Sequence, residues 1–421
     1  MSRNRRNTRR NNRIKEFLTW RNFCIIIGIL ILIIIICIGI NIGRSINSKI
    51  EIAKQQEELD KQSQQIFEEI SESIEETNKN ISESDSILRI SAVGDILCSN
   101  DMLEDAYDKE SKTYDFSHMF SNITNFVNKS DIVIGTMETG ITNSNKYDEK
   151  NAPLEFAKAV RDSGVNLVTI SHNHSLDNGV EGLQETRENL EKLDFDVVGQ
   201  KKEDNCIIIK EIKQSKIAFL TYTCFLDDEE KLKKDEIQSV NIYSKKQAKS
   251  DIEYAKKQGA QYICVMIHWG DAISEVVNSE QKEIADYLVE NGVNLIIGSH
   301  PSVVQPMEIK QNKEGENVFV AYSIGTYIST LSAKEARTEL VLNIELRKSG
   351  KDGKIYLNKV DYTPIYMLDN GDKANNRFEL MDMKNLAKSY KGDKTDKISK
   401  ETYEDLIKGL NRLNKILNIE E

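Results

Sequence analysis

The sequence LVTISHNHSLDNG, residues 167–179, joins a short apolar run to a cluster of potential metal ligands. Residues 167–170 are typical of a buried strand, and His172, Asn173 and His174 come almost directly after it. A strand that ends in polar side chains and leads into a helix is the unit that places functional loops in α/β folds. The segment therefore predicts both the fold class and the location of the chemistry.

The same arrangement occurs at four other places in the chain. Potential ligands close apolar runs in Val93-Gly94-Asp95, Met137-Glu138, His268-Trp269-Gly270-Asp271 and Gly298-Ser299-His300-Pro301. The chain has five histidines, and four of them lie in these four segments and the first one taken together. Carboxylates, an amide and neutral imidazoles favour Mn, Fe or Zn over Ca or Mg. The pattern therefore predicts a divalent-metal site at the strand ends.

His174 and Asp177 form a candidate acid pair within the first segment. A histidine beside a metal can protonate a leaving oxygen, and a carboxylate such as Asp177 would orient it. The alternative is a capping loop, in which Asp177 or Asn178 begins the helix predicted at 180–193.

Strand-like and helix-like segments alternate from residue 87 to residue 370. Strands are predicted at 88–93, 132–136, 167–170, 197–198, 206–209, 217–222, 263–267, 295–297 and 318–322. Helices are predicted at 154–163, 180–193, 245–258 and 279–291. This alternation predicts an α/β fold, and later alternating runs at 339–345 and 354–362 indicate a second sheet.

Residues 371–421 are predicted to form a charged C-terminal extension with one amphipathic helix. Its apolar side chains are Tyr403, Leu406, Leu410, Leu413 and Leu417. We interpret this helix as a packing or partner-binding element without chemistry of its own.

The first 43 residues predict a membrane anchor. Eight cationic residues lie in the basic tail 1–22, and an uncharged, isoleucine-rich run occupies 23–43. A run of this length spans the roughly 30 Å apolar core of a bilayer as a helix, and its cationic flank stays in the cytoplasm. We therefore predict a single-pass protein of the cell membrane with a cytoplasmic N-terminus and an extracellular C-terminal domain. A cleaved signal peptide is the alternative, although the run is long for one and no A-x-A-like site comes after it.

The segment 44–86 is a predicted polar stalk. Ile52, Leu59, Ile66, Ile70, Ile74 and Ile81 recur at intervals of four and seven. This pattern is that of a short helical coiled coil, which would form a homodimer, but a solvated spacer fits the composition equally well.

The charge of the chain limits its possible partners, and its cysteine content limits the roles of the thiols. The formal net charge is −11 although eight cationic residues precede the apolar run, so the remainder is strongly acidic. An acidic domain argues against nucleic acid as a partner. The six cysteines include no CxxC pair, and we interpret those outside the predicted anchor as buried free thiols.

Taken in order, the motifs resemble those of the CapA-type poly-γ-glutamate capsule synthesis family, which is related to calcineurin-like metallophosphoesterases. They read Gly-Asp, x-Glu, Asn-His-x-x-Asp, His-Trp-Gly, Gly-x-His-Pro and Tyr-Ser-x-Gly, and the resemblance covers residues 87–366. It implies a four-layer αββα sandwich, an anchored and outward-facing topology, and a role in the synthesis, export or attachment of an anionic capsular polymer. It also implies the membrane, the polymer and membrane-bound polymer synthase subunits as partners.

The resemblance carries over to individual residues. The implied metal ligands are Asp95, Glu138, Asn173, His268 and His300, and the implied general acid is His174. The chain departs from the family pattern at Thr136, His172, Ser302 and Thr326. Because Ser302 replaces an imidazole, a single metal or a weakened site competes with a two-metal centre.

These motifs leave two functions open. The chain is either a metal-dependent hydrolase or transferase that acts on a phosphoester or γ-glutamyl bond, or a non-catalytic component of a capsule synthase complex with a degenerate metal site.

Overall fold

The computed structural model describes Lys54 and residues 85–417, apart from 128, 145, 202–205, 332, 372–375 and 393–396. The chain divides into two units, one formed by Met1–Glu58 with Lys391–Asp396 and the other by Leu59–Tyr390 with Lys397–Glu421. Nearly all described residues belong to the second unit. The predicted tail 1–22, the anchor 23–43 and nearly all of the stalk 44–86 lie outside the described residues. No helix within the described part of the chain is long and apolar enough to cross a membrane.

The first sheet has eight strands. Its order is β18-β17-β16-β1-β4-β7-β8, and β15 pairs with β1 outside that path. The strands are β1 (Ser86–Ile96), β4 (Ile132–Met137), β7 (Leu167–Thr169), β8 (Asp196–Val198), β15 (Thr326–Ile328), β16 (Thr338–Lys348), β17 (Ile355–Asp369) and β18 (Phe378–Asp382). β1, β4, β7 and β8 run parallel, whereas β16 lies antiparallel to β1.

The second sheet has six strands in the order β13-β14-β12-β11-β10-β9. The strands are β9 (Ile207–Ile212), β10 (Ser215–Thr223), β11 (Tyr262–His268), β12 (Leu295–Ser299), β13 (Met307–Gln311) and β14 (Asn317–Ala321). β10, β11, β12 and β14 run parallel. Two-stranded pairs form between β2 (Tyr107–Asp108) and β3 (Thr113–Tyr114), and between β5 (Gly140–Ile141) and β6 (Asn151–Ala152).

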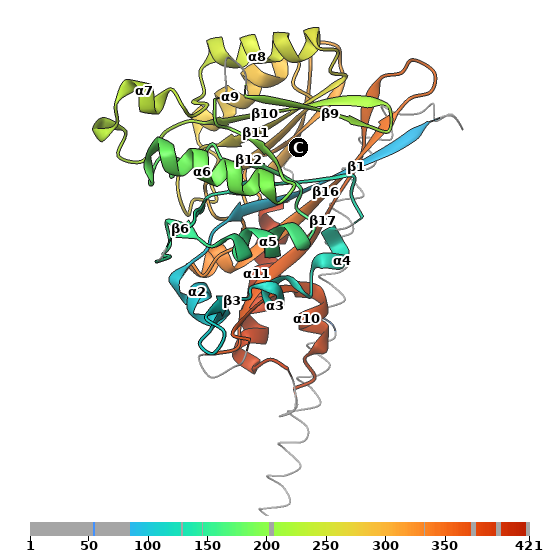
Figure 1. Ribbon diagram of the computed structural model, residues 1–421. Helices are drawn as coiled ribbons and strands as arrows, with labels where there is room; N and C mark the ends of the chain where they lie inside the picture. Colours follow the sequence, from blue (N-terminus) through green and yellow to red (C-terminus); the bar gives the residue numbers. More distant parts are fainter. Residues whose placement is uncertain are drawn as a thin grey trace, which may run out of the picture. The chain divides into compact units, whose positions relative to one another are not determined.

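Helices cover the outer face of each sheet. The α-helices are α2 (Asn100–Ala106), α3 (Ser117–Phe120), α4 (Thr124–Val127), α5 (Leu154–Asp162), α6 (Gly179–Lys192), α7 (Lys234–Ile237), α8 (Lys245–Lys257), α9 (Ser279–Glu290), α10 (Met383–Ser389) and α11 (Lys400–Leu417). Short 3₁₀ turns form at Glu229–Lys231 and Lys334–Arg337. Figure 1 shows α8 and α9 on the outer side of the second sheet, and α5, α2 and α3 beyond the first sheet.

Three apolar clusters define the layers. One packs the first sheet against α2, α3, α5 and α6, and another packs the second sheet against α8 and α9. The third lies between the two sheets and includes Ile90, Ile134, Phe219 and Leu342. The order is therefore helix, sheet, sheet, helix, which agrees with the αββα order that the resemblance implied.

The predicted elements agree well with the observed ones, with one correction. The four predicted helices are α5, α6, α8 and α9, and each end differs by at most one residue. The strands predicted at 339–345 and 354–362 exist as β16 and β17, but they do not form a separate sheet. They extend the first sheet because β16 pairs with β1, and the second sheet comes from the middle of the chain.

The C-terminal helix α11 is a packing element. All five apolar side chains that predicted it are buried, and Leu413 and Leu417 join the cluster between the sheets. Gly409 lets the helix approach β16 closely, since a Cβ there would collide with the Thr338 side chain.

Candidate metal centre

The site forms where the carboxyl ends of parallel strands from both sheets meet. β1, β4 and β7 of the first sheet deliver Asp95, Glu138 and Asn173, while β11 and β12 of the second deliver His268 and His300. Parallel strands end at a common edge of a sheet, so residues far apart in sequence come together there.

Gly94 makes the position of Asp95 possible. A Cβ at Gly94 would collide with the carbonyl oxygen of Gly325, so only glycine permits this close approach of β1 to β15. The Asp95 amide donates to that same oxygen at 3.0 Å, and the pairing of β1 with β4 shifts register next to Asp95. The irregularity is local, and it fixes the carboxylate at the strand end.

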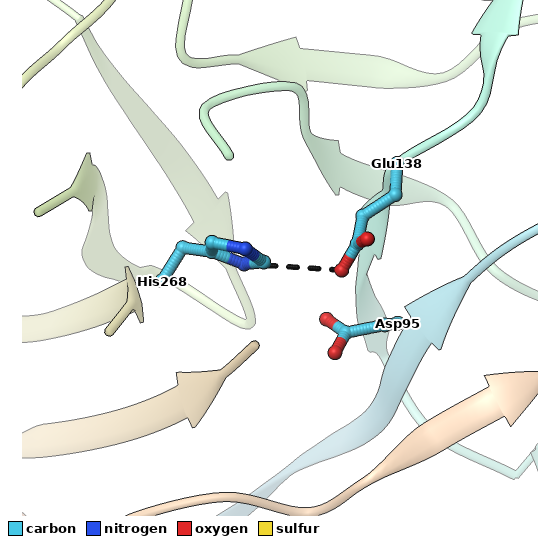
Figure 2. Close-up of side chains that lie close together, drawn as sticks. All are labelled: Asp95, Glu138 and His268. Carbon is cyan, nitrogen blue, oxygen red and sulfur yellow. Dashed lines mark ion pairs between the residues drawn. The ribbon is translucent and has the colours of Figure 1, made fainter. Parts of the chain in front are cut away.

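Asp95, Glu138 and His268 form the closest group of potential ligands. Each offers one ligand atom, and these atoms all lie within 4.8 Å of one another. Figure 2 shows the three side chains pointing toward a common space, with His268 Nδ1 3.9 Å from Glu138 Oε1. Asp95 Oδ1 is buried and makes no hydrogen bond within the described part of the chain. Two carboxylates, one of which has an unsatisfied buried oxygen, and an imidazole together fit a divalent cation.

The electrostatics of this group favour the same interpretation. Burial raises the pKa of Asp95 to about 7. Burial, and next the neighbouring Asp95, raise the pKa of Glu138 well above its usual value. Burial also lowers the pKa of His268 well below its usual value, so its imidazole is neutral and able to bind a metal. A cation would remove the cost of holding two carboxylates side by side in a dry site.

Asn173 and His300 reach this group through His268. Asn173 Oδ1 lies 2.8 Å and His300 Nδ1 3.1 Å from His268 Nε2, and the His300 amide donates to Asp95 Oδ2 at 3.1 Å. Burial lowers the pKa of His300 to about 4. The five predicted ligands therefore lie in one cluster, in which three are closely spaced and two contact that trio. That all five bind a metal stays a prediction.

His300 adopts a backbone conformation that is unusual for a residue with a side chain. Its φ is +93°, between strand β12 and Pro301. Such strain is retained where the surroundings fix a residue, and here the Asp95 contact and the Phe225 ring, 4.8 Å away between centroids, do so.

His174 and Asp177 lie together at the edge of the trio. His174 Nδ1 is 3.3 Å from Asp177 Oδ2, and this hydrogen bond is the main cause that raises the pKa of His174. Lys150 Nζ lies 3.6 Å from the same oxygen. A half-exposed imidazole whose pKa is raised by a neighbouring carboxylate is suited to the predicted general acid. The capping alternative is not supported, because Asn178 is the residue before α6 and makes no side-chain cap hydrogen bond.

A cavity of about 400 Å³ opens beside these residues. The residues that line it include Glu138, His174 and Asp177, and also Leu97, Ser329 and Leu331. Its volume suits a small ligand or one unit of a polymer.

The four departures from the family pattern all lie at or near the centre. Thr136 Oγ1 donates to Ser299 Oγ at 3.3 Å, and Ser302 Oγ donates to the His300 carbonyl at 3.2 Å. Thr326 Oγ1 lies 3.3 Å from Ser329 Oγ. His172 is buried, and burial lowers the pKa of its imidazole to about 3. The three hydroxyls are thus engaged in local hydrogen bonds.

Sequence reasoning named Ser299 within a motif but gave it no role, and it missed Phe225 and Asp227. Ser299 Oγ lies 3.0 Å from His268 Nδ1, and Phe225 and Asp227 come after β10 at the mouth of the site. Asp227 Oδ1 accepts from Asn173 Nδ2 at 3.0 Å. The available signal was positional, because β10 was predicted as a strand and the residues after its end were not considered.

The sequence matches the family described as bacterial capsule synthesis protein PGA_cap over residues 89–331. The chain belongs to this family. The match begins in β1 and ends after β15, so it contains all seven predicted site residues.

Two curated relatives carry the name CapA. The chain is 24% identical over 276 residues to capsule biosynthesis protein CapA of Bacillus anthracis, covering 62% of this chain and 65% of that protein. It is 25% identical over 302 residues to PGA biosynthesis protein CapA of Bacillus subtilis (strain 168), covering 66% of this chain and 72% of that protein. The chain thus spans slightly less than two thirds of the length of the first relative. The CapA-type resemblance of the motifs is confirmed.

Two of the solved structures to which this chain is similar, both at low identity, are a phosphatase and a phosphoesterase. A phosphatase from Mycoplasma pneumoniae is 15% identical with a TM-score of 0.40, and the match covers 67% of this chain and 94% of that one. The calcineurin-like phosphoesterase YfkN from Bacillus subtilis is 14% identical with a TM-score of 0.41, and the match covers 78% and 98%.

Proposed function

We propose that this capsule synthesis protein is a metal-dependent hydrolase or transferase that acts on a phosphoester or γ-glutamyl bond during assembly of an anionic, poly-γ-glutamate-type polymer. The observation that carries the proposal is the buried trio of Asp95, Glu138 and His268, with an unsatisfied carboxylate oxygen, beside a cavity that His174 also lines. Membership of the capsule family supports the biological role.

Each group of residues has its own role in the proposed reaction. Asp95, Glu138 and His268 would hold Mn, Fe or Zn, with Asn173 and His300 beside them. A bound metal supplies Lewis-acid polarisation of a phosphoryl or carbonyl oxygen. His174 gives its proton to the leaving oxygen or nitrogen while the new bond is formed by water or, in a transferase, by an acceptor hydroxyl or amine, which releases a proton to solvent. Asp177 holds the imidazole and stabilises its charged form. Leu97 and Leu331 line the same cavity and would limit the access of water to a bound substrate.

The proposed setting is the outer face of the cell membrane. The uncharged run 23–43 behind a cationic tail supports a single-pass anchor with the catalytic domain outside. Membrane-bound polymer synthase subunits are the proposed partners, and the heptad-like stalk 44–86 supports a homodimer.

Turnover by the purified full-length protein tests the proposal. Phosphodiester and γ-glutamyl substrates are supplied with Mn²⁺ or Zn²⁺, and His174→Gln is expected to lower kcat by ~10²–10⁴-fold while metal binding persists. His118→Gln is the matched control, because His118 pairs with Asp105 and is not among the residues that form the centre. Absence of turnover on every substrate by the metal-loaded wild type would exclude the enzymatic function.

A second candidate is a non-catalytic component that guides the polymer beside its synthase. It is favoured by the hydroxyls of Thr136 and Ser302, which make local hydrogen bonds rather than offering an additional ligand to the centre. Surface polymer distinguishes the two functions in cells. The second candidate expects polymer to persist in the His174→Gln strain and to disappear when residues 23–43 are deleted. The enzymatic proposal expects polymer to be lost in both strains.

A further inference from the structure

The loop after β10 brings a carboxylate from the second sheet to the histidine segment of the first sheet. Asp227 makes two hydrogen bonds to Asn173: its amide donates to the Asn173 carbonyl at 2.9 Å, and its Oδ1 accepts from Nδ2 at 3.0 Å. Its Oδ2 lies 3.4 Å from His174 Nδ1. Asp227 thus contacts both a predicted metal ligand and the predicted acid.

The first contact determines which end of the Asn173 amide faces the metal trio. Because Nδ2 is held by Asp227, Oδ1 points to His268 Nε2 at 2.8 Å. A flipped amide would present donor protons to the trio and would lose the bond to Asp227. Only the oxygen can bind a cation, so the orientation decides whether Asn173 is a ligand.

The second contact determines the orientation of the His174 ring. Nδ1 lies between Asp177 Oδ2 at 3.3 Å and Asp227 Oδ2 at 3.4 Å. Two carboxylate oxygens beside one ring nitrogen fix the orientation of the ring and favour the tautomer that carries its hydrogen on Nδ1.

We propose that Asp227 is a positioning residue that joins the metal centre to the acid: one oxygen orients the Asn173 amide, and the other holds the His174 ring. The proposal deepens the proposed function and rests on it for its catalytic meaning. The geometric part can be tested without metal or substrate. Asp228 is a matched control because it is the adjacent acid in the same loop, and its Oδ1 contacts Lys231 at 2.7 Å instead.

The first test is NMR of the metal-free, full-length chain labelled with ¹⁵N at histidine, which gives signals from five residues. In Asp227→Ala, the His174 Nδ1 and His268 Nε2 resonances are expected to move, while the His118 signals stay. In Asp227→Asn, the new amide oxygen still accepts from Asn173 but the negative charge beside His174 is lost. The His174 signal should therefore move and the His268 signal should stay. Asp228→Asn should leave both unchanged.

Unchanged His174 and His268 signals in Asp227→Ala would overturn the proposal. If Asp227→Ala does not fold, Asp227→Asn decides the matter, since an unmoved His174 signal there excludes the second contact. A general structural effect is recognised by movement of His118, which lies beside Asp105 away from the centre.

The second test is calorimetric titration with Mn²⁺ or Zn²⁺. Asp227→Ala is expected to bind metal ~10–100-fold more weakly than the wild type, as removal of a residue that orients a ligand usually does. Asp227→Asn should bind more tightly than Asp227→Ala, and Asp228→Asn should match the wild type. Wild-type affinity in Asp227→Ala would overturn the coupling to the metal centre. If the wild type binds neither metal, the proposed function fails, and the NMR result still decides the role of Asp227.

Discussion

Two pairs of carboxyl groups at the site differ in what surrounds them. Asp95 and Glu138 are buried side by side, and Asp95 Oδ1 makes no hydrogen bond among the described residues. Asp177 and Asp227 are partly exposed, and each has an oxygen within 3.4 Å of His174 Nδ1. The exposed pair already faces an imidazole within the chain, and the hydrogen bond to Asp177 raises the pKa of that imidazole. The buried pair faces no such partner among the described residues, since the pKa of the nearby His268 is lowered, so its negative charge must be balanced by protons or by a metal ion from solution. This contrast is the physical basis for assigning metal binding to the first pair and proton transfer to the second.

The largest expected effect comes from removing one member of the buried pair. In the wild type, metal at 100 times its dissociation constant should stabilise the fold by about 2.7 kcal/mol. Glu138→Gln removes a charged ligand from the trio, so the metal-dependent increase in unfolding temperature should vanish. Differential scanning calorimetry with and without Mn²⁺ or Zn²⁺ measures this increase in unfolding temperature. Asp177→Asn is the control and should keep the increase; an equal loss in both variants would remove the distinction between the pairs.

Asp95 and Asp177 should also respond to pH with opposite sign in the metal-free protein. The pKa of Asp95 is raised by burial from 3.8 to about 7, so the folded state holds a proton that the unfolded state has lost. Stability from this group is present below about pH 4 and falls as pH rises toward about 7. The unfolding temperature should therefore decrease by several degrees across this range, and Asp95→Asn should flatten that decrease.

The stability that Asp177 contributes should depend on pH in the opposite way to that of Asp95. Burial by itself raises the pKa of Asp177, but the hydrogen bond from His174 holds that pKa below its usual value. Its contribution is therefore present above the unfolded pKa and is lost as pH falls. Asp177→Asn should lower the unfolding temperature at neutral pH and have little effect at acidic pH. The same pH dependence in Asp95→Asn and Asp177→Asn would contradict the assigned pKa shifts.

The smallest expected effect concerns a hydroxyl that supports the trio indirectly. Thr136 Oγ1 donates to Ser299 Oγ, which lies 3.0 Å from His268 Nδ1. Thr136→Val keeps the shape and removes the hydroxyl, so it should cost about 1 kcal/mol in unfolding free energy. Metal affinity should change little, because His268 keeps its contact with Asn173. Chemical denaturation and titration measure the two quantities, and a large loss of affinity would show that Thr136 is part of the metal centre.

The sequence was sufficient to predict the site residues that close strands. His172, Asn173 and His174 come after an apolar run, and so do Glu138 and His300, so parallel strands were expected to bring them together. Asp227 was not found, because its role depends on contact between a loop of the second sheet and a loop of the first. The position of Asp227 after a predicted strand was the one available signal, and nothing in the run 224–228 indicates its contact with the first sheet, which arises only when the two sheets pack.

The sheet membership of late strands was likewise beyond sequence patterns. Residues 339–345 alternate as a strand should, but alternation does not tell which strand is the partner. β16 pairs with β1, which lies near the other end of the domain's sequence. The pairing forms because the apolar face of Leu340, Leu342 and Ile344 packs into the cluster between the sheets. Long-range burial decided this pairing.

Metal analysis of the purified full-length protein is the most direct test of the central claim. After incubation with Mn²⁺ or Zn²⁺ and removal of free ions, mass spectrometry should find an equimolar amount of metal in the wild type. It should find none in Glu138→Gln or His268→Ala, and an equimolar amount again in the control Asp228→Asn. A wild type without metal, or a Glu138→Gln variant that keeps it, would contradict the assignment of the buried trio as a metal centre.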